Sequence, residues 1–178
     1  HRLPQRLIDM ADPNPTADGV AGTEADPNAP EFSLQSVYLK DCSFEAPKGP
    51  RVEGQWNPNI NLELDTATEI LSPDLREIVL RISVTAKNGD ATAFLVEVQQ
   101  GGIFAVRNLG EEDYRRAVAS IGPNVLFPYA RAQIANLVTQ GGFPQLLLPP
   151  VNFELLYARS RAEAAEAQTQ AAQQPLNS

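Results

Sequence analysis

The sequence contains a single histidine, His1, and a single cysteine, Cys42. A Ser-His-Asp or Cys-His catalytic arrangement needs an imidazole beside the nucleophile, and His1 lies outside the part of the chain that we expect to fold. A structural zinc site needs several His or Cys ligands, which this sequence does not supply. We therefore expect neither of these nucleophilic mechanisms in the folded part, and no bound metal. We also expect Cys42 to be a small packed side chain in a reducing compartment, because one cysteine cannot form an intrachain disulfide.

Long apolar runs are also missing. No segment approaches the roughly 18 consecutive apolar residues that span a bilayer, and the N-terminal stretch HRLPQRLID lacks the apolar centre of a secretory signal. Basic charge is scarce, because 14 Lys and Arg against 22 Asp and Glu give a formal charge of −8. Nucleic-acid binders draw non-specific affinity from cationic side chains, so this class is disfavoured. The expectations are a cytoplasmic location, no direct membrane insertion, no nucleic-acid partner and a basic protein partner.

Composition divides the chain into three parts. Residues 1–31 are rich in Pro, Gly, Ala, Asp and Thr, and after Ile8 they have almost no large apolar side chains to offset the entropy lost on ordering. We predict a disordered acidic N-terminal extension over residues 1–31 and a folded domain over residues 32–160. Residues 161–178 have helix formers but no apolar stripe, which predicts a mobile C-terminal tail.

Alternation of apolar and polar residues predicts four strands. The first begins near Phe32 and places five side chains on one face: Phe32, Leu34, Tyr38, Cys42 and Phe44. Further alternating runs cover residues 60–65, 78–86 and 91–106, and the Asn88-Gly89 dipeptide before the last run is a strong hairpin signal. A connection rich in Pro and Gly, residues 46–58, follows the first strand and carries Trp56.

Helical patterns follow the strands. Acidic residues at 111–113 favour a helix start, and Gly122-Pro123-Asn124 is predicted to interrupt and restart that helix. Asn152 is a suitable N-cap for a last helix. Strands followed by helices predict an α+β fold, a four-stranded antiparallel sheet with two helices packed on one face.

Gly101 and Gly102 stand inside the last predicted strand, in the stretch VEVQQGGIFAV. A phosphate-binding loop would place its glycines between a strand and a helix N-terminus, and here strand-like residues lie on both sides. A glycine pair inside a strand indicates a bend, a bulge or the close approach of another backbone. We predict an oligomer interface formed by Val96, Val98, Gln100, Gly101 and Gly102. A bend within one protomer is the alternative.

Several segments together resemble the SecB family of bacterial protein-export chaperones. The matching stretches are YLKDCSFEAP (38–47), TAFLVEVQQGGIF (92–104), PNVLFPYAR (123–131), GFPQL (142–146) and PVNF (150–153). The resemblance implies a homotetramer, built as a dimer of dimers, that has no ATPase activity, is not an enzyme and needs no cofactor. It implies a chaperone that keeps unfolded secretory and outer-membrane precursor proteins competent for translocation and delivers them to the SecA ATPase.

The resemblance also implies two binding surfaces. Clients are expected in a groove between the connection 46–58 and the last helix, where Trp56, Phe153 and Tyr157 are the aromatic candidates, with core packing as the alternative for each. SecA is expected to bind the exposed sheet face through a small basic, zinc-bearing region, and the matching residues here are Asp41, Glu45, Leu95 and Glu97. The zinc belongs to the partner.

Two other functions compete with this interpretation. A SecB-like stress or toxin-antitoxin chaperone would share the fold and serve one dedicated client. An enzyme would need carboxylates that converge across a pocket. The candidate pairs are Glu63 with Asp65 on the polar face of a strand and Glu111 with Glu112 at a helix start, so this alternative is disfavoured.

Overall fold

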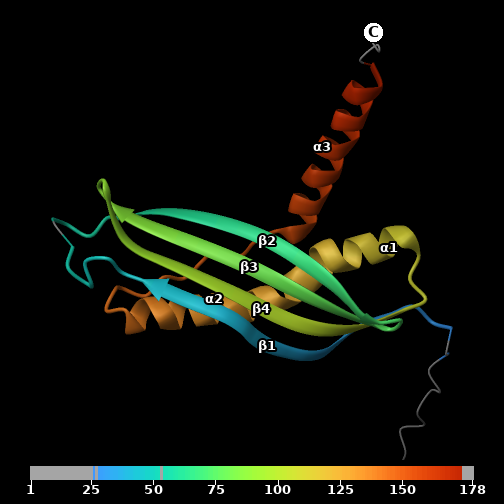
Figure 1. Cartoon of the computed structure of the whole chain (residues 1–178), viewed down its shortest axis with the longest axis horizontal. Helices are drawn as coiled ribbons and strands as arrows, with labels where there is room; N and C mark the ends of the chain where they lie inside the picture. The colour runs from blue at the N-terminus through green and yellow to red at the C-terminus, as the bar shows by residue number, and fades with distance from the viewer. Residues whose placement is uncertain (1–25, 27, 53, 174–178) are drawn as a thin grey trace, which may run out of the picture.

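Four long strands form one antiparallel sheet in the order β1-β4-β3-β2 (Figure 1). The strands are β1 (Glu31–Glu45), β2 (Asn59–Ser72), β3 (Leu75–Asn88) and β4 (Ala91–Arg107). This computed structural model describes residues 26, 28–52 and 54–173, so nearly all of the predicted N-terminal extension lies outside the described residues. The α+β fold predicted from the sequence is confirmed.

Tight turns join three of the strands. Gly89 and Asp90 connect β3 to β4, and Gly89 has a φ of +61°, which glycine adopts without the steric cost of a Cβ. The predicted hairpin is therefore confirmed, since Asn88 pairs with Ala91 across it. Pro73 and Asp74 connect β2 to β3 in the same way. The connection 46–58 carries the chain from β1 to β2, at the opposite edge of the sheet.

The helices come after the sheet. Helix α1 (Glu111–Arg116), the π-helical turn η1 (Ala117–Ile121) and α2 (Gly122–Gln140) form one continuous helical segment, and α3 (Phe153–Gln173) follows. The predicted restart at Gly122-Pro123-Asn124 coincides with the start of α2, but the chain is not broken there, because Gly122 has helical angles of −58° and −55° and the helical turn η1 precedes it. Pro123 stands in the first turn of α2 and has no N–H to bond back to the preceding turn, which agrees with the irregular π-helical segment η1 directly before it.

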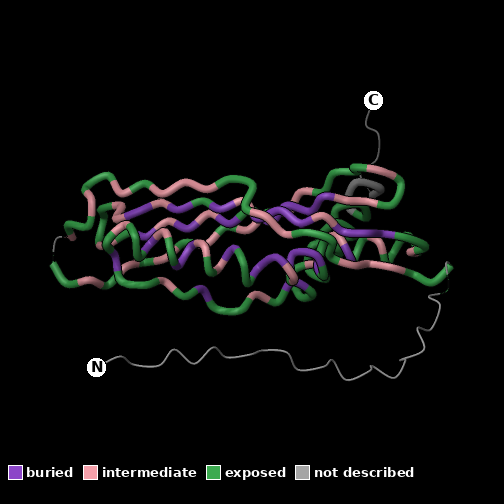
Figure 2. Tube along the Cα trace, turned by 90° about the horizontal axis from the view of Figure 1, so that it is seen from below, coloured by how far each residue is buried: buried purple, intermediate pink, exposed green. Residues whose placement is uncertain are grey.

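The core lies between α2 and the face of the sheet that we call the inner face. The largest fully buried side chains of the inner face are Ile78, Leu80, Ile82, Val84, Phe94, Val96, Val98 and Phe104. Helix α2 packs on them with Leu126, Ile134 and Val138, which recur at the spacing of one helix face. Figure 2 shows the buried residues concentrated between the sheet and this helix.

Two bulges in β1 correct the predicted face of Tyr38. Leu34 pairs with Phe104 and Ser36 with Ile103, which leaves Gln35 as an extra residue; Lys40 is the second extra residue, between Leu39 and Asp41. After each extra residue, the even-numbered and odd-numbered residues of the strand exchange faces. Tyr38 lies between the bulges, so it shares the outer face with its partner Gly101, and Cys42 and Phe44 return to the inner face.

Helix α3 packs mainly on η1 and then leaves the body of the protein (Figure 1). Its helical conformation continues to Gln173, beyond the residue 161 at which the predicted tail starts, and residues 161–169 are exposed. Mobility of this tail stays a prediction. Asn152 caps the helix as predicted, because its Oδ1 accepts a hydrogen bond from the Leu155 N–H at 2.9 Å.

Candidate functional site

The four residues predicted to meet SecA lie together on the outer face of the sheet. In the β1–β4 register Glu45 pairs with Leu95 and Ser43 with Glu97, while Asp41 pairs with Gln99. Residues paired across an antiparallel ladder point to the same face, so all four share the outer face. Asp41, Glu45 and Glu97 are exposed, and Leu95 is partly buried.

Sequence reasoning missed two further members of this surface, Glu63 and Asp65 on β2. They reach the same face because Glu63 pairs with Ser83 and Asp65 with Arg81, and these β3 residues pair in turn with Glu97 and Gln99. We call the resulting set the acidic outer surface: Asp41, Glu45, Glu63, Asp65 and Glu97. Strand parity placed Glu63 and Asp65 on a polar face, but only the strand order shows that this face adjoins Glu97.

The acidic outer surface keeps most of its negative charge. Among the described residues one ion pair is present within it, from Arg81 Nη1 to Asp65 Oδ2 at 3.1 Å, and both side chains are at least half exposed. The other contacts are neutral, because Ser83 Oγ donates to Glu97 at 3.3 Å and Gln99 Nε2 approaches Asp41 at 3.5 Å. A hollow of about 260 Å³ lies among Asp41, Glu63, Asp65, Arg81, Glu97 and Gln99. The surface therefore suits a basic partner with small protruding groups.

Trp56 lies at the end of the sheet where the connection 46–58 crosses. Its ring is partly buried and tilts against Phe143, with centroids 5.6 Å apart. Phe143 also meets Phe94 and Phe44, at 5.0 and 6.3 Å. Trp56 therefore covers one edge of an aromatic cluster and keeps part of its surface open to solvent.

Phe153 and Tyr157 lie near the other end of α2. Phe153 is 5% exposed and stacks edge to face with Phe127, so core packing, the alternative left open by the sequence, accounts for its ring. Tyr157 is partly buried, and its hydroxyl donates to Glu112 at 3.3 Å. Arg161 lies over the Tyr157 ring and also pairs with Glu112.

The structure does not bring the three aromatic candidates together. Trp56 packs on Phe143, just after the C-terminus of α2, whereas Phe153 packs on Phe127 in the second turn of α2. The 16 residues from Phe127 to Phe143 correspond to about 24 Å at the helical rise, of which the last few residues lie outside the helix. A groove between the connection 46–58 and the last helix, which the resemblance implied, is therefore not continuous in the single chain.

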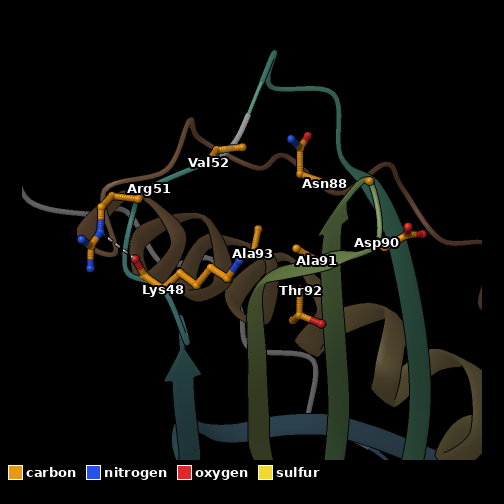
Figure 3. A pocket seen from close by; sticks show the side chains of 9 residues that line it. Lys48, Arg51, Val52, Asn88, Asp90, Ala91, Thr92 and Ala93 are labelled. Carbon is orange, nitrogen blue, oxygen red and sulfur yellow. Dashed lines mark hydrogen bonds between the residues drawn. The ribbon is translucent and has the colours of Figure 1, made fainter.

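Two hollows lie beside helix α2 and beside the connection 46–58, and neither has Trp56, Phe153 or Tyr157 in its lining. A groove of about 630 Å³ runs along α2 beside the loop 145–151 and includes Leu147, which is 60% exposed. A second hollow, of about 340 Å³, lies between the connection and the β3–β4 hairpin. Figure 3 shows Lys48, Arg51 and Val52 on one side of it and the hairpin residues on the other. The groove along α2 is the more apolar of the two in its lining side chains.

The residues predicted for an oligomer interface are largely used within the chain. Val96 and Val98 are 0% and 1% exposed in the inner-face core, and Gln100 is buried with its Nε2 donating to the Tyr38 carbonyl at 2.7 Å. A Cβ at Gly101 would lie 2.6 Å from the Tyr38 ring, and one at Gly102 would lie 2.7 Å from Leu126. The close approach that requires the glycine pair therefore occurs within one protomer, and the side chains of Val96 and Val98 are not available for direct contact with a neighbour.

A polar cluster closes over Gly101 on the outer face. Glu77, which is nearly buried, accepts hydrogen bonds from the Tyr38 hydroxyl and from Lys40 Nζ, the latter at 2.6 Å. The hydrogen bonds from Lys40 and Tyr38 hold the pKa of Glu77 below its usual value. Burial, followed by the neighbouring Glu77 carboxylate, raises the pKa of Tyr38 to about 12. The bulge residue Lys40 thus supplies the cation that compensates the buried carboxylate.

The family model described as "Preprotein translocase subunit SecB" matches residues 25–164. The chain belongs to the SecB family. The protein-export protein SecB of Pseudomonas fluorescens is 51% identical over 135 residues, which cover 75% of this chain and 85% of the relative. The corresponding SecB of Pseudomonas putida F1 is 49% identical over 147 residues, covering 82% and 91%. The function of this SecB-family chain is accordingly that of a protein-export chaperone.

A solved SecB-like structure shares the fold. The SecB-like chaperone of Mycobacterium tuberculosis, in complex with a peptide from an antitoxin, superposes with a TM-score of 0.59 over 67% of this chain and 90% of that chain. Its sequence identity is 16%, so this likeness concerns the fold alone. In the part of the SecB-family chain that the structure describes, no His, Cys, Asp and Glu cluster is placed to hold a metal, and no helix is long and apolar enough to cross a membrane.

Proposed function

We propose that this protein is a cytoplasmic, ATP-independent export chaperone that binds unfolded secretory and outer-membrane precursors and delivers them to SecA. The observation that carries the proposal is the family match over residues 25–164, together with about 50% identity to proteins named for protein export. No catalytic residue enters the proposal.

Client holding is proposed to use exposed apolar surface near Trp56 and Tyr157 and along the α2 groove. Binding without sequence preference requires non-directional burial of apolar surface, about 25 cal/mol per Å², at several weak subsites. Leu147 in the groove and the partly open Trp56 supply such surface at separate places. An extended client can contact both places because it does not have to fit into one compact pocket.

SecA recognition is proposed to use the acidic outer surface, with Leu95 beside Glu97 and Glu45. Several exposed acids and one ion pair favour a compact basic partner, such as the zinc-bearing region that the family resemblance implies. An exposed charge pair contributes at most about 1 kcal/mol, so we expect a fast, salt-sensitive association rather than a tight one.

The proposed assembly is a homotetramer arranged as a dimer of dimers. Glycine-pair packing no longer supports it, because Gly101 and Gly102 meet side chains of their own chain. Support comes from exposed apolar side chains at positions the single chain leaves uncovered, among them Ile70 at 68%, Tyr129 at 47% and Leu155 at 46%.

The test is light scattering of the purified protein, alone, with a reduced unfolded precursor, and then with SecA. A species of about four times the 19.3 kDa chain that takes up precursor and then SecA is expected. A monomer that ignores unfolded chains would overturn the proposal. A protein that holds precursors but does not bind SecA would instead favour the dedicated-client chaperone of the same fold.

A further inference from the structure

We propose that residues 2–8, which we call the basic segment, dock on the acidic outer surface of their own chain and compete there with the basic partner. The docking needs only the charges and the reach of this chain, and its effect on partner binding rests on the SecA recognition proposed above. Among the described residues, α2 packs on the inner face of the sheet, so the acidic outer surface is left open.

The charges of the N-terminal part of the chain are segregated. Arg2 and Arg6 are the only side chains among residues 1–8 that are charged at pH 7, whereas residues 9–31 contain several acids and neither Lys nor Arg. The chain as a whole carries a formal charge of −8. The basic segment is therefore the one stretch of this N-terminal part that a negatively charged surface attracts.

The acidic outer surface matches both kinds of side chain in the basic segment. Its acids are exposed, and the only ion pair within it, among the described residues, joins Arg81 to Asp65. Leu95 lies beside the acids, because it pairs with Glu45 and shares its face with Glu97. Arginine side chains can bind such carboxylates through two parallel hydrogen bonds, and the leucines of the basic segment can bury apolar surface beside Leu95.

The chain is long enough to bring the arginines to this surface. Glu31 is fixed at the start of β1, because it pairs with Arg107 and accepts a hydrogen bond from its guanidinium at 2.9 Å. From Glu31 to Asp41 the strand extends about 33 Å at its usual rise per residue. About 25 residues join Arg6 to Glu31, and they can span at most about 80 Å.

The same length determines how strongly tethering favours docking. A disordered chain of this length, which the composition predicts, has a root-mean-square end-to-end distance of about 25–30 Å, close to the distance of about 33 Å along the strand. The effective concentration of the basic segment at the surface is then in the millimolar range. If its dissociation constant is about one-third of that concentration, the segment lowers the apparent affinity of a competing partner about fourfold.

The two hollows described above are the competing places for the basic segment. Among the described residues, Arg131 is the only charged side chain that lines the groove along α2. The hollow beside the connection 46–58 is lined by Lys48 and Arg51 against the single acid Asp90. Both hollows carry more positive than negative charge in their lining, so the arginines favour the acidic outer surface.

Photo-cross-linking in the full chain locates the basic segment. The probe is p-benzoylphenylalanine in place of Leu7, and the cross-linked peptides are identified by mass spectrometry. Cross-links to the strand residues around Leu95 and Glu97 are expected within one protomer, with a yield at least threefold lower at about 0.5 M salt than at about 0.05 M. Cross-links around Leu147, cross-linked dimers on a denaturing gel, or no cross-links at either salt concentration would overturn the proposal.

Charge reversal followed by rescue tests whether the arginines contact the acids. In the probe-bearing chain, Arg2→Glu with Arg6→Glu is expected to lower the cross-linking yield at least fivefold. Adding Glu63→Lys and Glu97→Lys to that chain is expected to restore at least half of the original yield, because the attraction returns with its signs exchanged. An unchanged yield in the first variant would contradict the proposal.

A charge-matched control separates contact from general attraction. Glu163→Lys with Glu166→Lys, on the exposed part of α3, changes the net charge by the same amount as the rescue pair. In the chain with reversed arginines this control is expected to restore less than about a tenth of the yield. Equal restoration by the two pairs would show a general effect of net charge and overturn the docking on the sheet.

Partner binding separates a failure of this inference from a failure of the proposed function. Arg2→Gln with Arg6→Gln is expected to raise the affinity for SecA about threefold to fivefold, whereas Arg115→Gln with Arg159→Gln, which changes the net charge equally, is expected to change it less than 1.5-fold. Cross-links around Leu95 without SecA binding would overturn SecA recognition and leave the docking standing. SecA binding that both pairs of substitutions raise equally would overturn the competition and leave the proposed function standing.

Discussion

Gly101 is expected to be required because the Tyr38 ring of the same chain occupies the space of its missing side chain. In Gly101→Ala the new Cβ would lie 2.6 and 2.7 Å from two ring carbons, about 1 Å closer than ordinary carbon contacts. The ring cannot easily move aside, because its hydroxyl is bound to Glu77, which is also bound to Lys40.

The expected magnitude follows from two opposing contributions. Overpacking at a close contact costs about 1–3 kcal/mol, and replacing a strand glycine by alanine regains about 0.5–1 kcal/mol. We expect Gly101→Ala to lower the free energy of unfolding by about 1–2 kcal/mol. In a Tyr38→Ala background the obstacle is gone, so the same substitution is expected to stabilise by about 0.5 kcal/mol, which gives a coupling of about 2 kcal/mol.

The assay is a double-mutant cycle by urea unfolding at one fixed protomer concentration, because association shifts apparent stability. Additivity within about 0.5 kcal/mol would refute the intramolecular explanation. In that case a smaller oligomer in light scattering of Gly101→Ala would return the glycine to a subunit interface.

Three further predictions concern titration, partner recognition and the aromatic candidates. Because Lys40 and Tyr38 hold the pKa of Glu77 below 4.5, Glu77 stabilises the fold above that pH and loses this contribution as the pH falls, so Glu77→Gln should flatten the acid side of the stability profile. The pKa of Tyr38 rises from 10.0 to about 12, so its contribution to the stability of the fold is complete below pH 10 and is lost between pH 10 and pH 12. Ultraviolet titration of the folded protein should show this late ionisation. Glu97→Lys should weaken SecA binding and its salt dependence in a titration, without loss of client holding; loss of both would indicate misfolding. Phe153→Ala should lower the free energy of unfolding by about 3–5 kcal/mol, because its ring is buried in the core. Trp56 should change its fluorescence when an unfolded client is added. An unchanged spectrum in a client-bound complex would remove Trp56 from the client surface.

The sequence predicted those parts of the fold that depend on local pattern. Strict alternation in residues 91–100 separates Val96 and Val98 from Leu95 and Glu97, and the structure keeps both sets on opposite faces. Asn88-Gly89 predicted the hairpin, because few residues suit that turn. The second strand was predicted too short, since Thr66, Ala67 and Thr68 blur the alternation over which β2 continues to Ser72.

What could not be predicted depends on distant partners. Tyr38 was placed on the wrong face because a bulge leaves no mark in the spacing of apolar residues until the partner strand is known. Glu63 and Asp65 join Glu97 only through the strand order. The distance between Trp56 and Phe153 depends on the path of residues 143–151 along α2, and that path has no periodic signal.

The two bulges of β1 change, twice along the strand, whether even-numbered or odd-numbered residues face the core. Even-numbered residues face the core before Gln35, odd-numbered residues face it between the two bulges, and even-numbered residues such as Cys42 and Phe44 face it again after Lys40. Loss of Gln35 alone would leave Leu34 opposite Phe104 and Ser36 opposite Ile103 as a regular ladder, so the side chains of both arms would keep their faces, and the same holds for Lys40 between Leu39 and Asp41. The pairing of β1 therefore does not require the two insertions to be kept together, and what loss of Lys40 would remove is its ion pair with Glu77.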